Sequence, residues 1–208
     1  MALPATENFA GAAAALSGSW TQANTGATTI RRDGAGLGTQ TTTDASSDNY
    51  AYWNADTFNN NQYSQFVWKS GSAGSGFCEV ACRASGTGAG TKLYQMQASG
   101  SASSGETALW LDNAGVFTNL ANYTLAFAAN DVQRIEANGT AIRGFKNGTG
   151  VGVAVTNATL AAGAAGIGAY WDSSGAPTFD DWEGGDLGVA ATYVPYNWRP
   201  VMLPIMSR

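Results

Sequence analysis

Two Asn-Gly pairs constrain the fold of this chain more than any other feature. They stand at 138–139 and 147–148 and flank the run 140–146. Asn and Gly tolerate the positive φ that a tight hairpin turn requires. Short runs rich in β-branched or aromatic residues lie on either side, at 132–137, 142–146, 151–156 and 167–171. The sequence therefore predicts a meander of antiparallel strands.

The composition agrees with an all-β chain. Of the 208 residues, 27 are Gly and only 12% are charged, about half the usual share. No segment carries the period of a long amphipathic helix. A β-sandwich of this length is routinely one domain, so we expect one domain over 1–187.

Three middle segments alternate between apolar and polar residues, as half-buried strands do. They span 77–83, 92–98 and 108–112, and we expect their apolar positions to point into a core. Cys78 and Cys82 lie four apart on one expected strand, about 13 Å by the strand rise, too far for a disulfide. Both are expected to be buried thiols. The outward positions expected to share one exposed sheet face are Glu79, Arg83, Gln95, Gln97 and Trp110.

The C-terminal half resembles a known family. A glycine hairpin, the GAAGIG run at 163–168 and the closing FDDWEGGDL at 179–187 resemble the concanavalin A-like lectin/glucanase (LamG-like) jelly roll. The segments 62–68 and 76–85 resemble its preceding strands, and 7–9 followed by Trp20 resembles its opening. The resemblance covers 7–187 and implies an antiparallel two-sheet β-sandwich.

The resemblance also implies two sites. The sheet face is the usual sugar-binding surface in this family, and the five outward residues supply amides, charges and an aromatic ring suited to a glycan. Many members hold a structural calcium between the N-terminal segment and an Asp of the last strand. Asp181, with Glu7 or Asn8, stands at the matching place, and hard oxygen ligands suit calcium.

Catalytic signatures are missing from the sequence. There is no His, so a Ser-His-Asp triad cannot form. Glycosidases on the resembled fold use a Glu-x-Asp-x-x-Glu pattern on one strand, which this chain lacks. Asp180 and Asp181 are adjacent and would point to opposite faces of a strand. We therefore expect a protein that is not an enzyme.

Charge and hydropathy exclude other partners. The net charge of −5 argues against nucleic acid, which needs clustered Lys and Arg. The apolar run 10–16 is too short to cross a bilayer, and no basic residue precedes it as in an ordinary signal peptide. We expect a protein without membrane insertion that is either cytosolic or leaves the cell by another route, such as lysis with a virus particle. Of these, we expect a protein made in the cytoplasm that ends at a virion surface or otherwise outside the cell.

The segment 188–208 departs from the family pattern. It carries Pro195, Pro200 and Pro204 among large apolar residues, which excludes a helix and disfavours a central strand. We expect an irregular arm. The sequence leaves open whether it packs on its own domain, packs on a neighbouring subunit of an oligomer, or is disordered.

Three functions follow as hypotheses. The first is a structural or adhesive surface protein of a particle, a phage virion decoration or fibre-type protein that binds glycans. The second is a free-standing carbohydrate-binding lectin module. The third is a glycoside hydrolase with an unfamiliar site.

Overall fold

The regular structure consists almost entirely of strands. The computed structural model describes residues 3–23, 28–42, 48–72, 76–173 and 175–188. The helical structure among these residues is one 3-10 turn, η1 (Gly88–Gly90). Within these ranges no helix is long and apolar enough to cross a membrane. The expected C-terminal arm, from residue 189 onward, lies outside the described residues.

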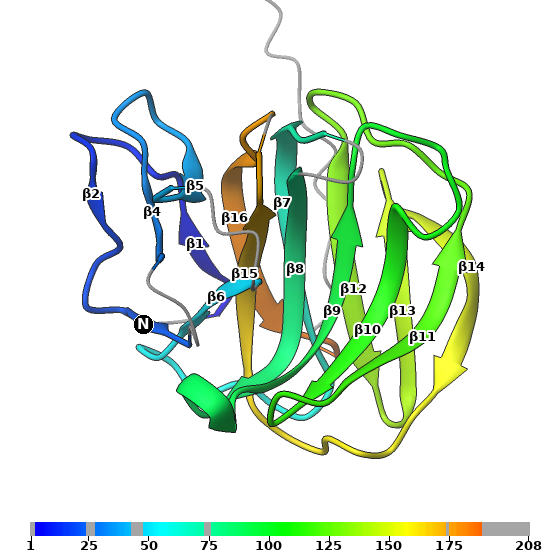
Figure 1. Ribbon diagram of the computed structural model, residues 1–208. Helices are drawn as coiled ribbons and strands as arrows, with labels where there is room; N and C mark the ends of the chain where they lie inside the picture. Colours follow the sequence, from blue (N-terminus) through cyan, green and yellow to red (C-terminus); the bar gives the residue numbers. More distant parts are fainter. Residues whose placement is uncertain (1–2, 24–27, 43–47, 73–75, 174, 189–208) are drawn as a thin grey trace, which may run out of the picture.

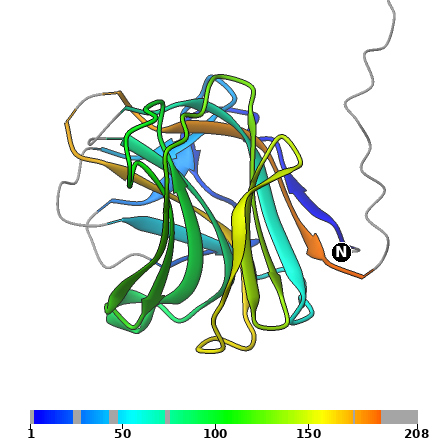
Figure 2. The same cartoon turned by 90° about the vertical axis from the view of Figure 1, so that its right-hand side faces the viewer.

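Two antiparallel sheets face each other, as Figure 2 shows edge-on. One has nine strands, in the spatial order β14 (Thr149–Thr156), β13 (Ala141–Lys146), β12 (Val132–Asn138), β7 (Gln62–Ser70), β16 (Thr178–Asp186), β5 (Gly38–Gln40), β4 (Ile30–Arg32) and β2 (Ala14–Ala15), with β1 (Ala5–Glu7) paired to β16. The other has seven, in the order β11 (Phe117–Tyr123), β10 (Thr107–Asn113), β9 (Lys92–Ala98), β8 (Gly76–Ser85), β15 (Ala164–Trp171), β6 (Asn49–Trp53) and β3 (Trp20–Gln22). The predicted all-β sandwich is confirmed (Figure 1).

Both predicted hairpins are present. Strands β12 and β13 pair Asn138 with Ala141, so Gly139 and Thr140 form the turn, and Gly139 has a φ of 57°. Strands β13 and β14 are joined by Asn147 and Gly148, with φ values of 52° and 76°. Positive φ at both residues is the geometry that favours Asn-Gly in a two-residue hairpin.

Strand β11 follows β10 after a tight turn. The turn before it contains Ala114 and Gly115, whose φ values are 59° and 83°. The Asn113 N–H donates to the Val116 carbonyl across this turn. The hairpin therefore closes immediately after β10, and the polar sequence of the edge strand hides its start.

The core lies between the sheets and is rich in aromatic rings. Phe179 stacks on Phe66 with ring centres 4.6 Å apart, and Phe9 meets it edge-on at 5.4 Å. Trp20 and Trp182 pack with ring centres 4.5 Å apart. The inward positions of the middle strands fill the same core, and both cysteines are buried and free, as predicted.

The edge strand β14 contains a bulge. Its partner β13 pairs Ile142 with Val155 and Gly144 with Val151, so three residues of β14 oppose one of β13. Gly152 has a φ of 63°, and the Arg143 guanidinium donates to its carbonyl oxygen at 2.9 Å. Val153, at the crest of the bulge, is 82% exposed.

Candidate functional site

Three neighbouring strands carry most of the predicted glycan-binding residues. Strand β9 lies between β8 and β10 and pairs with both. Glu79 is opposite Gln97, and Gln95 is opposite Trp110. Because cross-strand partners point to the same face of a sheet, these four side chains lie on the outer face of the seven-stranded sheet, toward the viewer in Figure 1.

The prediction that this whole face is exposed is wrong. Glu79 is 0% exposed and Gln95 is 1% exposed, while Gln97 and Trp110 are half-buried. The cause is the neighbouring strand β15, where a Cβ at Gly168 would meet the Tyr50 ring at 2.5 Å and Glu79 Oε2 at 2.6 Å. Because Gly168 has no side chain, the Tyr50 ring and the Glu79 carboxyl both pack over it. This packing shields the Glu79 carboxyl from water.

Arg83 does not belong to this face, which corrects a second prediction. Strand β8 changes register between Cys82 and Ser85, and Arg83 has a φ of 53°. The bulge interrupts the alternation that the sequence suggested. Its guanidinium, only 2% exposed, is turned toward the connections at one end of the sandwich.

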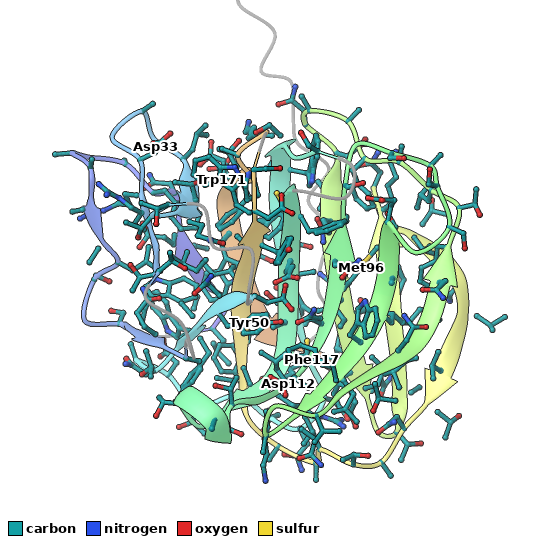
Figure 3. All side chains as sticks on the ribbon, viewed as in Figure 1. Asp33, Tyr50, Met96, Asp112, Phe117 and Trp171 are labelled. Carbon is teal, nitrogen blue, oxygen red and sulfur yellow. The ribbon has the colours of Figure 1, made fainter. Side chains whose placement is uncertain are left out.

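A buried acidic cluster lies on the outer face in place of an open row. Asp48 hydrogen-bonds to both Tyr50 and Glu79. Burial raises the pKa of the Asp48 carboxyl to about 6, with a further rise from the charge of Asp112. Burial also raises the pKa of Glu79 well above its usual range, and the charge of Asp48 adds to it. The Asp48 and Glu79 carboxyl groups therefore favour the protonated form more than ordinary carboxyl groups do. Figure 3 labels two residues that act on this pair, Tyr50 and Asp112.

The polar contacts around this pair are incomplete. Gln95 Nε2 donates to Glu79 Oε1 at 3.3 Å. Among the described residues, neither Glu79 Oε2 nor Gln95 Oε1 accepts a hydrogen bond at ordinary distance. Two-carboxylate glycoside hydrolysis needs carboxyl groups about 5 to 9.5 Å apart. Two carboxyl groups that hydrogen-bond directly to each other do not meet that requirement.

The accessible part of the outer face lies over β9, β10 and β11. Phe117 is 47% exposed and pairs with Asp112, and Asn119 pairs with Trp110. The Gln97 side chain donates to the Gly105 carbonyl at 2.9 Å, which holds its amide in place. Two aromatic rings and two amides therefore share one rim of the sheet.

The predicted calcium residues lie together at another place. Strand β1 pairs with β16, with Glu7 opposite Trp182. Glu7 and Asp181 line one surface pocket of about 460 Å³ with Asn8 and Glu183. Across the described parts of the chain, no group of three or more acidic, His or Cys side chains is placed to hold a metal ion. Glu7 and Asp181 alone fall short of the six to eight oxygens that calcium takes, and Glu183 already accepts a hydrogen bond from the Tyr63 hydroxyl. Water or main-chain oxygens would therefore have to complete a site here.

Asp48 and Tyr50 were not among the predicted site residues. Alternation along β6 places both on the face opposite Ala51 and Trp53, which point into the core. That signal was readable in the sequence. Their proximity to Glu79 was not, because β15 separates β6 from β8 in the sheet.

Solved structures with the same fold bind carbohydrates. The carbohydrate binding module CBM66 from Bacillus subtilis is 15% identical, with a TM-score of 0.55 over 78% of this chain and 91% of that chain. The calcium-bound exoplasmic/lumenal domain of VIP36 is 10% identical, with a TM-score of 0.59 over 82% and 84%. The same domain of VIP36 has been solved with mannose-containing ligands and calcium.

A third similar structure comes from work on endo-acting O-glycanases that prominent members of the human gut microbiota express to initiate mucin breakdown. It is 9% identical, with a TM-score of 0.58 over 88% of this chain and 98% of that chain. No family model matches the sequence, and no curated protein matches it. The chain has the two-sheet β-sandwich fold of these solved structures, consistent with the concanavalin A-like fold that the sequence resemblance implied.

Proposed function

We propose that the protein is a carbohydrate-binding module that binds a glycan on the outer face of its seven-stranded sheet. The observation that supports this most is the rim where Trp110 and Phe117 lie beside Gln97 and Asn119. Aromatic faces suit the apolar side of a sugar ring, and amides supply both donors and acceptors for hydroxyl groups. The buried cluster around Glu79 lies beside this rim on the same face of the sheet, and it positions Gln95 rather than meeting the glycan.

Glycan-array binding followed by calorimetry tests the proposal. Trp110→Ala and Phe117→Ala should each weaken binding at least tenfold, which corresponds to about 1.4 kcal/mol. Val153→Ala is the matched control, because it removes another exposed apolar side chain, from the edge of the other sheet. Equal affinities for all four proteins, or binding to no glycan on a broad array, would contradict the proposal.

Calcium at Glu7 and Asp181 is a second part of the proposal. The calcium-bound VIP36 structures and the shared pocket support it. If a cation binds there, it would join β1 to β16 and stabilise the start of the chain. Binding of calcium to the folded protein alone raises its melting temperature, so the rise should be smaller in Asp181→Asn.

The particle-surface function predicted from the sequence remains a proposal. It would place the protein at a virion surface or elsewhere outside the cell, as part of an assembly. Sedimentation of the purified full-length chain tests it: a stable oligomer supports an assembling subunit, and a monomer at all concentrations speaks against one. The absence of catalysis is likewise still a prediction, and it is checked by incubating the protein with the glycans it binds and looking for released sugars.

A further inference from the structure

A second pocket lies at one end of the sandwich, away from the aromatic rim. It forms where three connections meet: residues 54–61 before β7, the turn between β12 and β13, and residues 157–163 before β15. Its volume is about 800 Å³. Pockets of about 300 to 1,000 Å³ hold small molecules. The lining residues that matter here are Asn60, Asn61, Arg83, Thr140, Ala161 and Leu187.

Arg83 joins the three connections through its guanidinium. Nε and Nη2 both donate to the Asn60 carbonyl, at 3.0 and 2.8 Å. Nη2 also donates to the Gly139 carbonyl at 2.6 Å, and Nη1 donates to the Leu160 carbonyl at 2.7 Å. One buried side chain therefore joins three of the segments that line this pocket.

The charge of Arg83 is not balanced by an acid. Its four hydrogen bonds all go to main-chain carbonyl oxygens, and no carboxylate of the described chain forms an ion pair with it. Carbonyl groups are neutral dipoles, so these bonds do not neutralise the positive charge of the guanidinium. A buried, unpaired charge is unfavourable, and an anionic partner would stabilise it. A guanidinium has five N–H donors, and the second N–H on Nη1 is not among the four bonds.

An acid at this end of the sandwich, Asp186, is engaged elsewhere. Asp186 accepts a hydrogen bond from the Asn59 N–H at 2.8 Å and another from Asn59 Nδ2 at 2.6 Å. Both of its oxygens therefore hold the pocket wall. Around them, the exposed side chains of Asn60 and Thr140 offer hydroxyl and amide groups at the mouth of the pocket.

We propose that this end pocket is a binding site for an acidic sugar, a pyranose that carries a carboxylate. The carboxylate would accept from the remaining Nη1–H of Arg83, in a charge-assisted hydrogen bond. Asn60 and Thr140 would bind ring hydroxyls, and Ala161 and Leu187 would contact the apolar edge of the ring. This site is independent of the aromatic rim on the outer face.

Titration of the full chain with glucuronate, followed by NMR chemical shifts, tests the proposal, with uncharged glucose as the matched ligand. Glucuronate should give saturable shifts in 139–140 and 158–161, because its carboxylate pairs with the Arg83 guanidinium. Glucose should give none. Equal shifts with both sugars, or none with glucuronate at 20 mM, would overturn it.

Single substitutions distinguish binding in this end pocket from binding at the aromatic rim on the outer face. Arg83 cannot be used alone, because its loss would loosen three connections. Ala161→Trp fills the exposed side of the pocket without touching the guanidinium, and it should abolish glucuronate binding while leaving the melting temperature unchanged. Trp110→Ala should leave glucuronate binding intact. Binding that survives in Ala161→Trp, or that is lost in Trp110→Ala, would show that the acidic sugar binds elsewhere.

Discussion

Replacing Asp48 by Asn should stabilise the protein at neutral pH and leave it nearly unchanged in acid. The Asp48 side chain is half-buried and bonded to Glu79, and burial raises the pKa of its carboxyl from an ordinary value of 3.8 to about 6. Below about pH 3 the folded and unfolded chains both carry the proton, so the Asp48 carboxyl costs no stability there. As the pH rises, the unfolded chain releases its proton first, so the free energy of unfolding falls.

The size of this loss follows from the pKa. A shift of about two units corresponds to about 3 kcal/mol, at about 1.36 kcal/mol per unit. The loss from Asp48 develops between about pH 4 and pH 6, and the raised pKa of Glu79 extends it to higher pH. An amide at position 48 keeps the shape, does not ionise, and donates to the Glu79 carboxylate. Asp48→Asn should therefore gain up to about 3 kcal/mol at pH 8.

Urea unfolding followed by tryptophan fluorescence, at intervals from pH 4 to pH 8, measures the effect. The difference between variant and parent isolates this carboxyl from the other titrating groups. Asp172→Asn is the control, a carboxyl outside the cluster that bonds to the Ser173 hydroxyl. A difference that does not depend on pH, or an Asp48→Asn protein that is less stable at pH 8 than the parent, would refute the reasoning.

Other substitutions test the rest of the structure. Arg83→Gln should lower the free energy of unfolding by about 3 kcal/mol or more in urea titrations, because charged hydrogen bonds to three connections are lost. Phe179→Ala should cost about 3 to 5 kcal/mol by the same assay, because it leaves a cavity among stacked rings. Gly148→Val should cost about 1 to 3 kcal/mol, because a β-branched residue is strained at a φ of 76°. Calorimetric scans should show that added calcium raises the melting temperature of the parent more than that of Asp181→Asn.

Local signals in the sequence predicted much of the fold. The second Asn-Gly pair predicted a turn with positive φ, and Asn147 and Gly148 both have positive φ. Strict alternation in β8 and β9 placed Cys78, Val80 and Met96 in the core. Both kinds of signal act within a few residues, so one sequence is enough to read them.

The candidate site depended on information that alternation does not carry. Arg83 leaves the face of its strand because a bulge changes the register, and no residue type marks that bulge. Glu79 is buried because Tyr50, distant in sequence, folds over Gly168. Strand order decides such contacts, and strand order comes from the packing of the whole sheet.

The interrupted last strand of the nine-stranded sheet limits how copies of this protein can meet. An unbroken edge strand presents a ladder of free N–H and C=O groups, on which another chain can add a strand. The turn of the backbone at Gly152 and the guanidinium of Arg143 on its carbonyl break that ladder in the middle. Although β14 is rich in valine, it is therefore protected against pairing with an edge strand of another copy. Deleting residues 152–153 to straighten the strand should yield a protein that self-associates.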